Sequence, residues 1–150
     1  MTSDTVVPAI RGIHHLKFPV ASLERAAEFY TRVLGARRLA EFDHRSPAGT
    51  LFAVILEVPG LGTVLELRHN ETQAAAHRGF DPVTLRVTTR AELSSWCEHL
   101  DRLGIRHSPL LAGYVGWLVV FEDPDGRRIR LYSEELRGPE VPVTRDSPWL

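Results

Sequence analysis

The chain has 150 residues, of which 43% are hydrophobic and 25% are charged. This size fits one globular domain with a sizeable core, or two small halves that depend on each other, whereas two independent domains would be poorly buried. The formal net charge is −1, from 18 basic and 19 acidic side chains. Because nucleic-acid-binding domains usually carry a basic surface, nucleic acid is not expected as a partner.

The sequence also argues against disulfide bonds and membrane insertion. Cys97 is the single cysteine, so no internal disulfide bond can form. No apolar run approaches the roughly 20 residues that span a bilayer. The residues before Arg11 show neither the basic region nor the apolar region of a secretion signal. We therefore expect a cytoplasmic protein that has no membrane partner.

The first half of the sequence predicts a strand, a helix and three more strands. Residues 10–20 are a short apolar-rich run, and the next segment has apolar residues at helical spacing. Ser22 suits the start of this helix and Gly35 suits its end. The three strand candidates that follow are residues 37–42, 51–58 and 63–68. This half is therefore expected to have the order βαβββ.

The second half repeats that order. A strand is predicted at residues 83–87, and Thr89 with Glu92 forms a capping box for a helix that stops at Gly104. The remaining predicted strands are residues 105–108, 116–122 and 127–132, and residues 123–126 form the turn between the last two.

The spacing of matching features indicates an internal duplication. The two helix ends lie 69 positions apart (103 − 34), and the two opening strands lie 67 apart (82 − 15). We interpret residues 10–69 as module one, 70–79 as a linker, 80–133 as module two, and 134–150 as an irregular tail of the same domain. Trp149 in that tail could dock on the body or on a neighbouring subunit.

Several segments resemble the vicinal oxygen chelate superfamily, which contains glyoxalases, bleomycin-resistance proteins and extradiol dioxygenases. Residues 12–16, 24–30 and 33–35 resemble the opening of a module, and residues 121–126 with 129–132 resemble its closing hairpin. The resemblance covers about residues 10 to 133. It implies an α+β fold in which two βαβββ modules form half-barrels around a cavity. In that family a divalent metal often chelates adjacent oxygens of the substrate there.

The family takes its metal ligands from the first and last strands of both modules. By this correspondence His15 and Glu66 occupy the positions in module one, where they could bind a metal or act as acid and base. Pro82 and Arg130 occupy those in module two, but proline has no side-chain donor and a guanidinium repels a cation. The resemblance therefore implies a degenerate metal site and no cofactor. A divalent metal could bind if His14, His44 or His107 supplied a substitute ligand.

Strand alternation predicts which side chains face the cavity. Apolar residues of each strand must meet the helices, so their polar neighbours face the opposite side. The aromatic rings of Tyr114 and Trp117 could stack on a planar ligand. The predicted ligand-binding residues are Lys17, Arg68, Thr84, Arg86, Tyr114, Trp117, Arg130 and Tyr132. This excess of cations predicts an anionic ligand, and we expect an ion pair between Glu66 and Arg130 across the pseudo-twofold axis.

These observations favour a metal-independent member of the family that binds a small anionic or aromatic molecule, as resistance or sequestration proteins do. The alternative is an enzyme of the lyase, isomerase or dioxygenase type that uses His15 and Glu66. A regulatory or scaffold module with an empty cavity is a third hypothesis. Structural interpretations also stay open: His15 as a core histidine, the cations as rim residues, and Cys97 as a core residue. Family members commonly form homodimers, sometimes by exchanging modules, so we expect a homodimer.

Overall fold

The computed structural model describes residues 5–150 of the chain. Its first half contains β1 (His15–Val20), α1 (Leu23–Leu34), β2 (Arg37–Arg38), a 3-10 turn (Ala40–Phe42), β3 (His44–Arg45), β4 (Leu51–Glu57), β5 (Val64–His69) and α2 (Glu71–Ala76). Its second half contains β6 (Val83–Val87), α3 (Arg90–Arg102), β7 (Leu111–Ala112), β8 (Gly116–Glu122) and β9 (Arg128–Leu136).

The two halves form sheets of equivalent topology. The first sheet has the order β1-β5-β4-β2, and the second has the order β6-β9-β8-β7. In each sheet the opening strand pairs in parallel with the closing strand, which brings Lys17 beside Glu66 and Thr84 beside Arg130. The predicted α+β fold with two βαβββ modules is confirmed.

The helices begin and end where the sequence predicts. The Ser22 hydroxyl accepts a hydrogen bond from the backbone N–H of Arg25 at 3.2 Å. Gly35 closes α1 in the left-handed conformation, with φ 68°. Both hydrogen bonds of the capping box between Thr89 and Glu92 are present at the start of α3. Local sequence therefore determines these boundaries, because each cap satisfies backbone groups that the helix leaves without a partner.

Two predicted strands are wrong in part. Only Arg37 and Arg38 of residues 37–42 are paired, because the chain then closes a 3-10 turn in which the Arg38 guanidinium holds Asp43. Residues 105–108 make a single bridge, between His107 and Phe121. The ladder cannot continue because Pro109 has no N–H, and the Ser108 hydroxyl accepts the Val120 N–H instead. Pairing resumes in the short strand β7, which the sequence analysis missed.

The segment expected as a linker, residues 70–79, contains the helix α2. Asn70 caps this helix by accepting a hydrogen bond from the backbone N–H of Gln73 at 3.0 Å. Ala74 is buried, and the helix packs beside β1. The connection between the modules is therefore ordered over much of its length. No helix in the part of the chain that the structure describes is long and apolar enough to cross a membrane.

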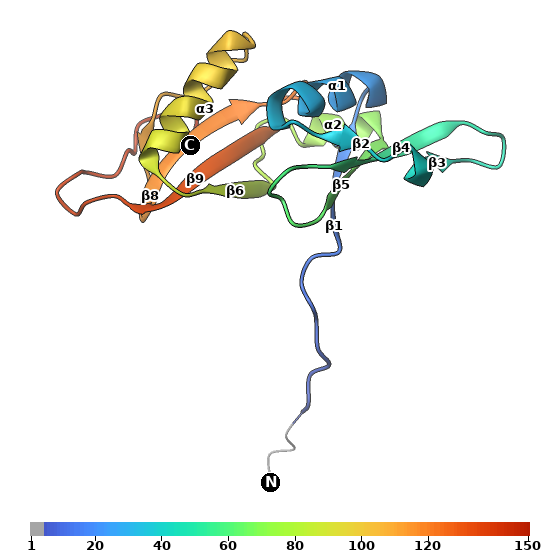
Figure 1. Cartoon of the computed structure of the whole chain (residues 1–150), viewed down its shortest axis with the longest axis horizontal. Coiled ribbons are helices and arrows are strands. Elements are labelled where there is room, and N and C mark those ends of the chain that lie inside the picture. Colours follow the sequence, from blue (N-terminus) through green and yellow to red (C-terminus); the bar gives the residue numbers. More distant parts are fainter. Residues whose placement is uncertain (1–4) are drawn as a thin grey trace.

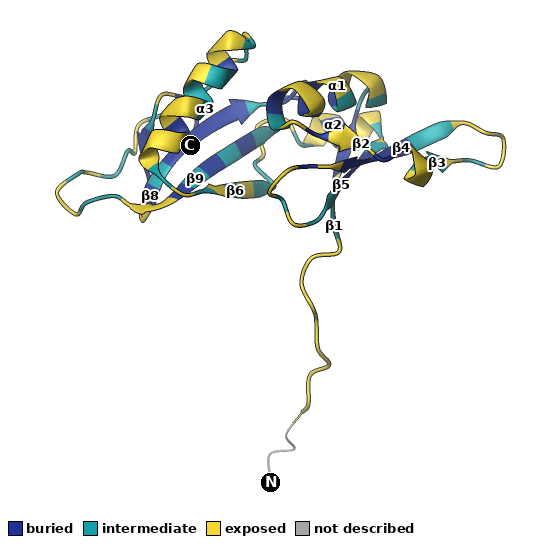
Figure 2. Ribbon diagram, in the orientation of Figure 1, coloured by how far each residue is buried: buried dark blue, intermediate teal, exposed yellow. Residues whose placement is uncertain are grey.

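Both modules share one hydrophobic core on the helical side of the sheets. α1 and α3 cover the same side of the two sheets (Figure 1), and the buried residues of β8 and β9 lie beneath α3 (Figure 2). The two helices touch, because the His99 imidazole lies 3.0 Å from the Val33 carbonyl oxygen. Phe29 of α1 also packs against Phe121 of β8, with ring centroids 6.3 Å apart. The faces opposite the helices, which we call the inner faces, therefore turn away from this shared core.

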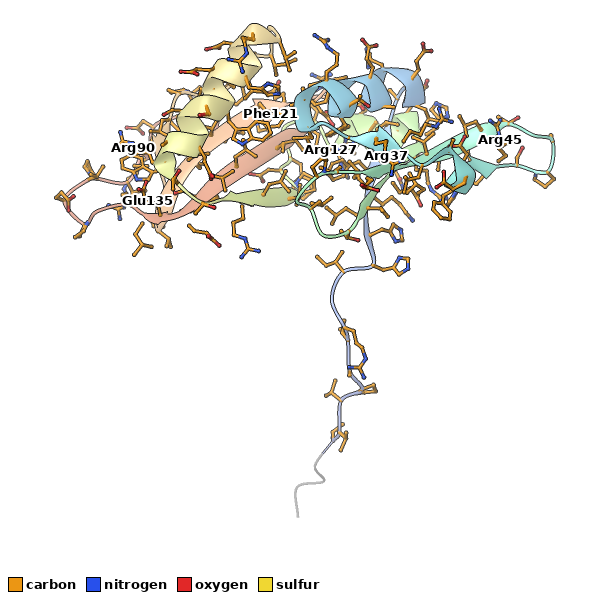
Figure 3. The ribbon with its side chains drawn as sticks, viewed as in Figure 1. Arg37, Arg45, Arg90, Phe121, Arg127 and Glu135 are labelled. Carbon is orange, nitrogen blue, oxygen red and sulfur yellow. The ribbon has the colours of Figure 1, made fainter. Side chains whose placement is uncertain are left out.

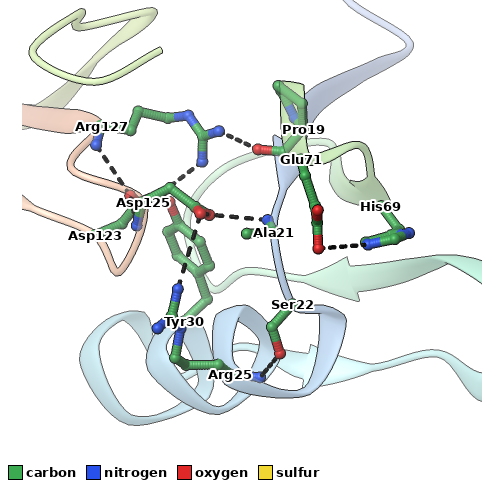
Figure 4. Close-up of polar contacts among 10 residues, drawn as sticks. All are labelled: Pro19, Ala21, Ser22, Arg25, Tyr30, His69, Glu71, Asp123, Asp125 and Arg127. Atoms are coloured by element: carbon green, nitrogen blue, oxygen red, sulfur yellow. Dashed lines mark hydrogen bonds and ion pairs between the residues drawn. The ribbon is translucent and has the colours of Figure 1, made fainter. Parts of the chain in front are cut away.

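A buried polar network joins the two modules (Figure 4). Asp123, in the turn between β8 and β9, accepts hydrogen bonds from the Tyr30 hydroxyl and the Arg127 guanidinium, both at 2.6 Å. All three side chains are buried. Burial raises the pKa of Tyr30, and the negative charge of Asp123 raises it further, so this phenol stays a hydrogen-bond donor. The closing hairpin of module two is thus fastened to the helix of module one.

Arg127 carries the network to β1 and α2. It lies near the middle of the molecule, whereas Arg90 and Glu135 lie at the end formed by module two (Figure 3). Its guanidinium donates to the Pro19 carbonyl oxygen and, at 3.1 Å, to Nδ1 of His77. It also lies 4.6 Å from the centre of the Phe18 ring. Every face of this buried cation is therefore matched by an acceptor, a carboxylate or an aromatic ring, as burial of a charge requires.

Tyr30→Phe should lower the free energy of unfolding by about 1–3 kcal/mol, because a buried oxygen of Asp123 then loses a donor. Urea denaturation would measure this change. The matched control is Tyr114→Phe at a position that is 73% exposed, where we expect a change of about 0.5 kcal/mol or less. Equal effects of the two substitutions would contradict the structural role given to the network.

The stability of the protein should fall as the pH drops below about 6.5, the ordinary pKa of histidine. Burial lowers the pKa of His77 in the folded state, and the charge of Arg127 lowers it further. The unfolded chain therefore takes up this proton at a higher pH than the folded chain, so the stabilisation is complete above pH 6.5 and is lost as the pH falls toward the folded pKa. His77→Asn, which keeps an acceptor for Arg127, should flatten the pH dependence of urea denaturation between pH 7 and 5. The exposed His69→Asn should not.

Candidate functional site

The inner face of module one carries a charged cluster centred on Glu66. This residue is only 3% exposed, although its strand face is polar. The Arg68 Nε donates to Glu66 Oε2 at 2.9 Å, and the Lys17 ammonium lies 3.8 Å from the same oxygen. Side-chain alternation along the paired strands β1 and β5 puts these residues on the same face of the sheet. One buried carboxylate is therefore shared by two half-exposed cations.

Two imidazoles approach the other oxygen of Glu66. The Nε2 atoms of His44 and His15 lie 3.5 Å and 3.9 Å from Oε1. His44 Nδ1 lies 2.8 Å from the Phe42 carbonyl oxygen, which favours a proton on that nitrogen. In the neutral form of His44, a lone pair on Nε2 would then face a carboxylate oxygen. A metal ion between these two atoms would relieve that repulsion.

The residues at the family's metal positions do not form a ready metal site. Among residues 5–150, no group of three or more His, Cys, Asp or Glu side chains is arranged to hold a metal ion. Arg68 and Lys17 occupy the second oxygen of Glu66 and would repel a divalent cation. Arg130 stands at one of the second-module positions with its own carboxylate partner. A metal would therefore need a rearrangement of the side chains around Glu66.

The predicted ion pair between Glu66 and Arg130 is wrong. Arg130 is held by Asp81, whose carboxylate lies 2.7 Å from Nη2, whereas Glu66 pairs with Arg68 and Lys17. The reason is geometric: the modules share their helical side, so one chain does not bring its two inner faces together. Asp81, just before β6, was not singled out in the sequence. The sequence signal for Asp81 was its position next to Pro82, which stands at one of the family's metal-ligand positions.

The other predicted residues of module two are dispersed. Arg86 is exposed and its guanidinium lies 3.3 Å from the Glu134 carboxylate, while the neighbouring Thr84 is also exposed. The hydroxyl of Tyr132 accepts hydrogen bonds from the backbone of the turn before β8. Tyr114 is exposed in that turn.

Trp117 lies on the opposite, helical side of the sheet. The Arg90 guanidinium stacks 4.0 Å from the centre of the Trp117 ring, and the ring packs against the shared core. The structure does not bring Trp117 to the inner face. Alternation along β8 accounts for this, because Val119 and Phe121 on the same face belong to the core.

Three cavities lie near these groups. One of about 610 Å³ lies between the modules. Its lining comes mainly from β6, including Thr84 and Arg86, and from the segment between β4 and β5, with Trp96 of α3. A second, of about 370 Å³, borders Lys17 and Arg68. A third, of about 340 Å³, lies on the inner face of module two and borders Arg130 and Tyr132. Two of these three cavities therefore lie on the inner faces, and the one between the modules borders Thr84 and Arg86.

The fold and site define a class of protein built from paired βαβββ modules, with a histidine on the first strand and a glutamate on the last strand of module one. The chain belongs to the Glyoxalase/Bleomycin resistance protein/Dioxygenase superfamily, whose family model matches residues 12–131.

Two curated relatives have enzyme names. The chain is 27% identical over 140 residues to a putative ring-cleaving dioxygenase, MhqA, from Bacillus subtilis; the match covers 89% of the chain but only 44% of that relative. It is also 27% identical over 150 residues to a lactoylglutathione lyase from Pseudomonas aeruginosa, with 83% of the chain and 84% of the relative covered. The chain thus spans less than half of the dioxygenase and most of the lyase.

Solved structures share the fold at low sequence identity. TnmS3, an antibiotic binding protein from Streptomyces sp. CB03234, superposes with a TM-score of 0.69 at 24% identity, covering 86% of this chain and all of that one. The fosfomycin resistance protein FosX from Listeria monocytogenes gives 0.67 at 15% identity, covering 85% and 97%. These similarities show that the chain has the same fold as these two proteins.

Proposed function

We propose that the protein binds a small planar anion, such as an aromatic carboxylate or phenolate, and acts as a binding or sequestration protein with a degenerate metal site. The observation that carries this proposal is the charge balance on the inner face of module one. Lys17 and Arg68 share the single carboxylate of Glu66 beside a cavity of about 370 Å³. An anionic ligand would balance the remaining positive charge. An antibiotic binding protein and a fosfomycin resistance protein share this fold, which agrees with the proposal.

We further propose that the complete cavity forms in a homodimer. The inner faces of one chain both turn away from the shared core, so neither is closed by the other. A second copy related by a twofold axis would set module one of each chain against module two of its partner. Such module exchange would bring Glu66 of one chain toward Arg130 of the other, and would add Arg86 and Tyr132 to the cavity wall.

Planar anions should bind without any requirement for a metal. Isothermal titration of benzoate, salicylate and 4-hydroxybenzoate should give the same affinity with and without EDTA, and neutral benzamide should bind more weakly. Lys17→Gln and Arg130→Gln should each weaken the binding of these anions about tenfold, the typical effect of losing one charge-assisted contact. Arg32→Gln, on the exposed side of α1, is the control. Affinity that disappears with EDTA would count against the proposal.

Mixing the two weakened variants tests whether the cavity crosses two chains. If it does, exchanged heterodimers of Lys17→Gln and Arg130→Gln contain one cavity with both substitutions and one with neither. About a quarter of all cavities would then regain full affinity, as twofold symmetry requires. Size-exclusion chromatography with light scattering would confirm the dimer. No recovery of binding in verified heterodimers would refute the exchange of modules.

A second candidate function is an enzyme of the lyase, isomerase or dioxygenase type. The specific observation in its favour is the approach of His15 and His44 to one oxygen of Glu66, since two imidazoles and a carboxylate are a common ligand set for divalent metals. His15 and Glu66 could otherwise act as acid and base. The two enzyme-named relatives agree with this candidate.

Elemental analysis distinguishes the two candidates. Protein purified without a histidine tag should contain well below one equivalent of zinc, iron, nickel or manganese if the binding function is right. Near-stoichiometric metal that is lost in His44→Gln would instead support the enzyme. His107→Gln is the matched control, because its imidazole lies beside Asp101, away from Glu66.

A further inference from the structure

The C-terminal segment, residues 137–150, packs on the inner face of module two. Trp149 is 6% exposed and lies in a small hydrophobic cluster with Leu111, Leu118 and Val120. Leu118 and Val120 alternate along β8 with the core residues Val119 and Phe121, so these two side chains face away from α3. The predicted irregular tail therefore docks on its own chain, on the face where the proposed ligand would bind.

Several specific contacts hold this segment in place. Thr144 pairs with Ala112 of β7 by two hydrogen bonds, one from its own N–H at 2.8 Å and one to its hydroxyl at 3.0 Å. Arg128 donates to the Pro148 carbonyl oxygen at 2.8 Å. The Trp149 ring lies 5.0 Å and 5.4 Å from the guanidinium carbons of Arg106 and Arg128. These contacts offset the entropy lost when the segment is ordered.

The docked segment leaves a cavity of about 340 Å³ between itself and the sheet. Tyr114, Arg130 and Tyr132 line it from the body, and Thr144, Arg145 and Leu150 line it from the segment. This volume is within the range of small-molecule sites.

Two cationic side chains, Arg130 and Arg145, line the cavity. Among the described residues that line it, none carries a carboxylate side chain. Arg145 has a weak contact with the Tyr114 hydroxyl at 3.4 Å and lies 5.8 Å from the centre of that ring. Arg130 is held by Asp81 through Nη2, and its Nε is enclosed by protein atoms and does not face the cavity. Two guanidiniums thus line the same cavity.

Tyr132 adds a directed donor. Its hydroxyl oxygen accepts hydrogen bonds from the backbone N–H groups of Val115 and Gly116 at 3.0 Å and 3.1 Å. Because these bonds occupy the lone pairs of the oxygen, the phenolic proton remains for donation to a ligand. The Tyr132 hydroxyl and the guanidiniums of Arg130 and Arg145 therefore line the cavity with groups that can donate to an oxyanion.

We propose that the C-terminal segment forms a wall of the ligand site, and that Arg145 of this segment and Arg130 of β9 together bind the oxyanion group of an aromatic ligand. This proposal rests on the proposed binding function and specifies which residues hold the charged end of the ligand. Trp149 is the anchor that positions Arg145. The aromatic faces of Tyr114 and Tyr132 then border the ring of the ligand.

The test compares benzoate with neutral benzamide, titrated into the full-length protein and followed by calorimetry and by NMR of the tryptophan indoles. Arg145→Gln should weaken benzoate binding about tenfold, as expected for one charge-assisted contact, and should leave benzamide binding unchanged. Trp149→Ala should weaken benzoate binding as much and should increase protease cleavage within residues 137–148. Arg102→Gln, at an exposed position on α3, is the matched control. Unchanged thermal unfolding would show that each variant folds.

The possible outcomes separate this proposal from the function on which it rests. Benzoate binding that falls in Lys17→Gln but not in Arg145→Gln would keep the binding function and overturn the role of the segment. Tighter binding in Trp149→Ala would also overturn it, because the segment would then block the site. If the wild-type protein binds neither benzoate nor any other planar anion, the proposed function itself fails.

Discussion

The buried ion pair between Arg127 and Asp123 is the interaction on which the arrangement of the two modules depends. Arg127 is fully buried, so its charge must be met on every side. The partners that meet it come from both modules: Asp123 from the closing hairpin of module two, the Pro19 carbonyl oxygen from β1, and His77 from the segment between the modules. Tyr30 of α1 binds the same carboxylate. Another placement of the modules would keep this ion pair, which lies within one hairpin, but Arg127 would lose its Pro19 and His77 acceptors and Asp123 its Tyr30 donor.

This constraint explains why one chain does not close its own cavity. With the hairpin fastened to β1 and α1, the helices of the two modules share one core and the inner faces look outward. Each inner face then balances its own charges, Glu66 with Arg68 and Arg130 with Asp81. The distance between these two ion pairs is a consequence of the shared core. A partner chain and the C-terminal segment are the two means by which the outward faces can become an enclosed site.

The cluster around Glu66 combines groups that could bind a metal with cations that oppose one. The carboxylate remains buried, and both imidazoles remain near one of its oxygens. Lys17 and Arg68 lie at its second oxygen, where their charges oppose a divalent cation.

Local sequence determined the features of this protein that depend on short-range physics. The caps at Ser22 and Thr89, the glycine stop at Gly35 and the alternation along β1 and β5 follow from backbone hydrogen bonding and side-chain period, and each could be predicted. The strands predicted at residues 37–42 and 105–108 form only in part, because the turn closed by Asp43 and the missing N–H of Pro109 override strand propensity. Only the tertiary structure decided that Arg130 pairs with Asp81, that His44 approaches Glu66, and that Trp149 covers the inner face of module two. Those contacts join residues that are separated in the chain by 20 or more positions, so no local pattern reveals them.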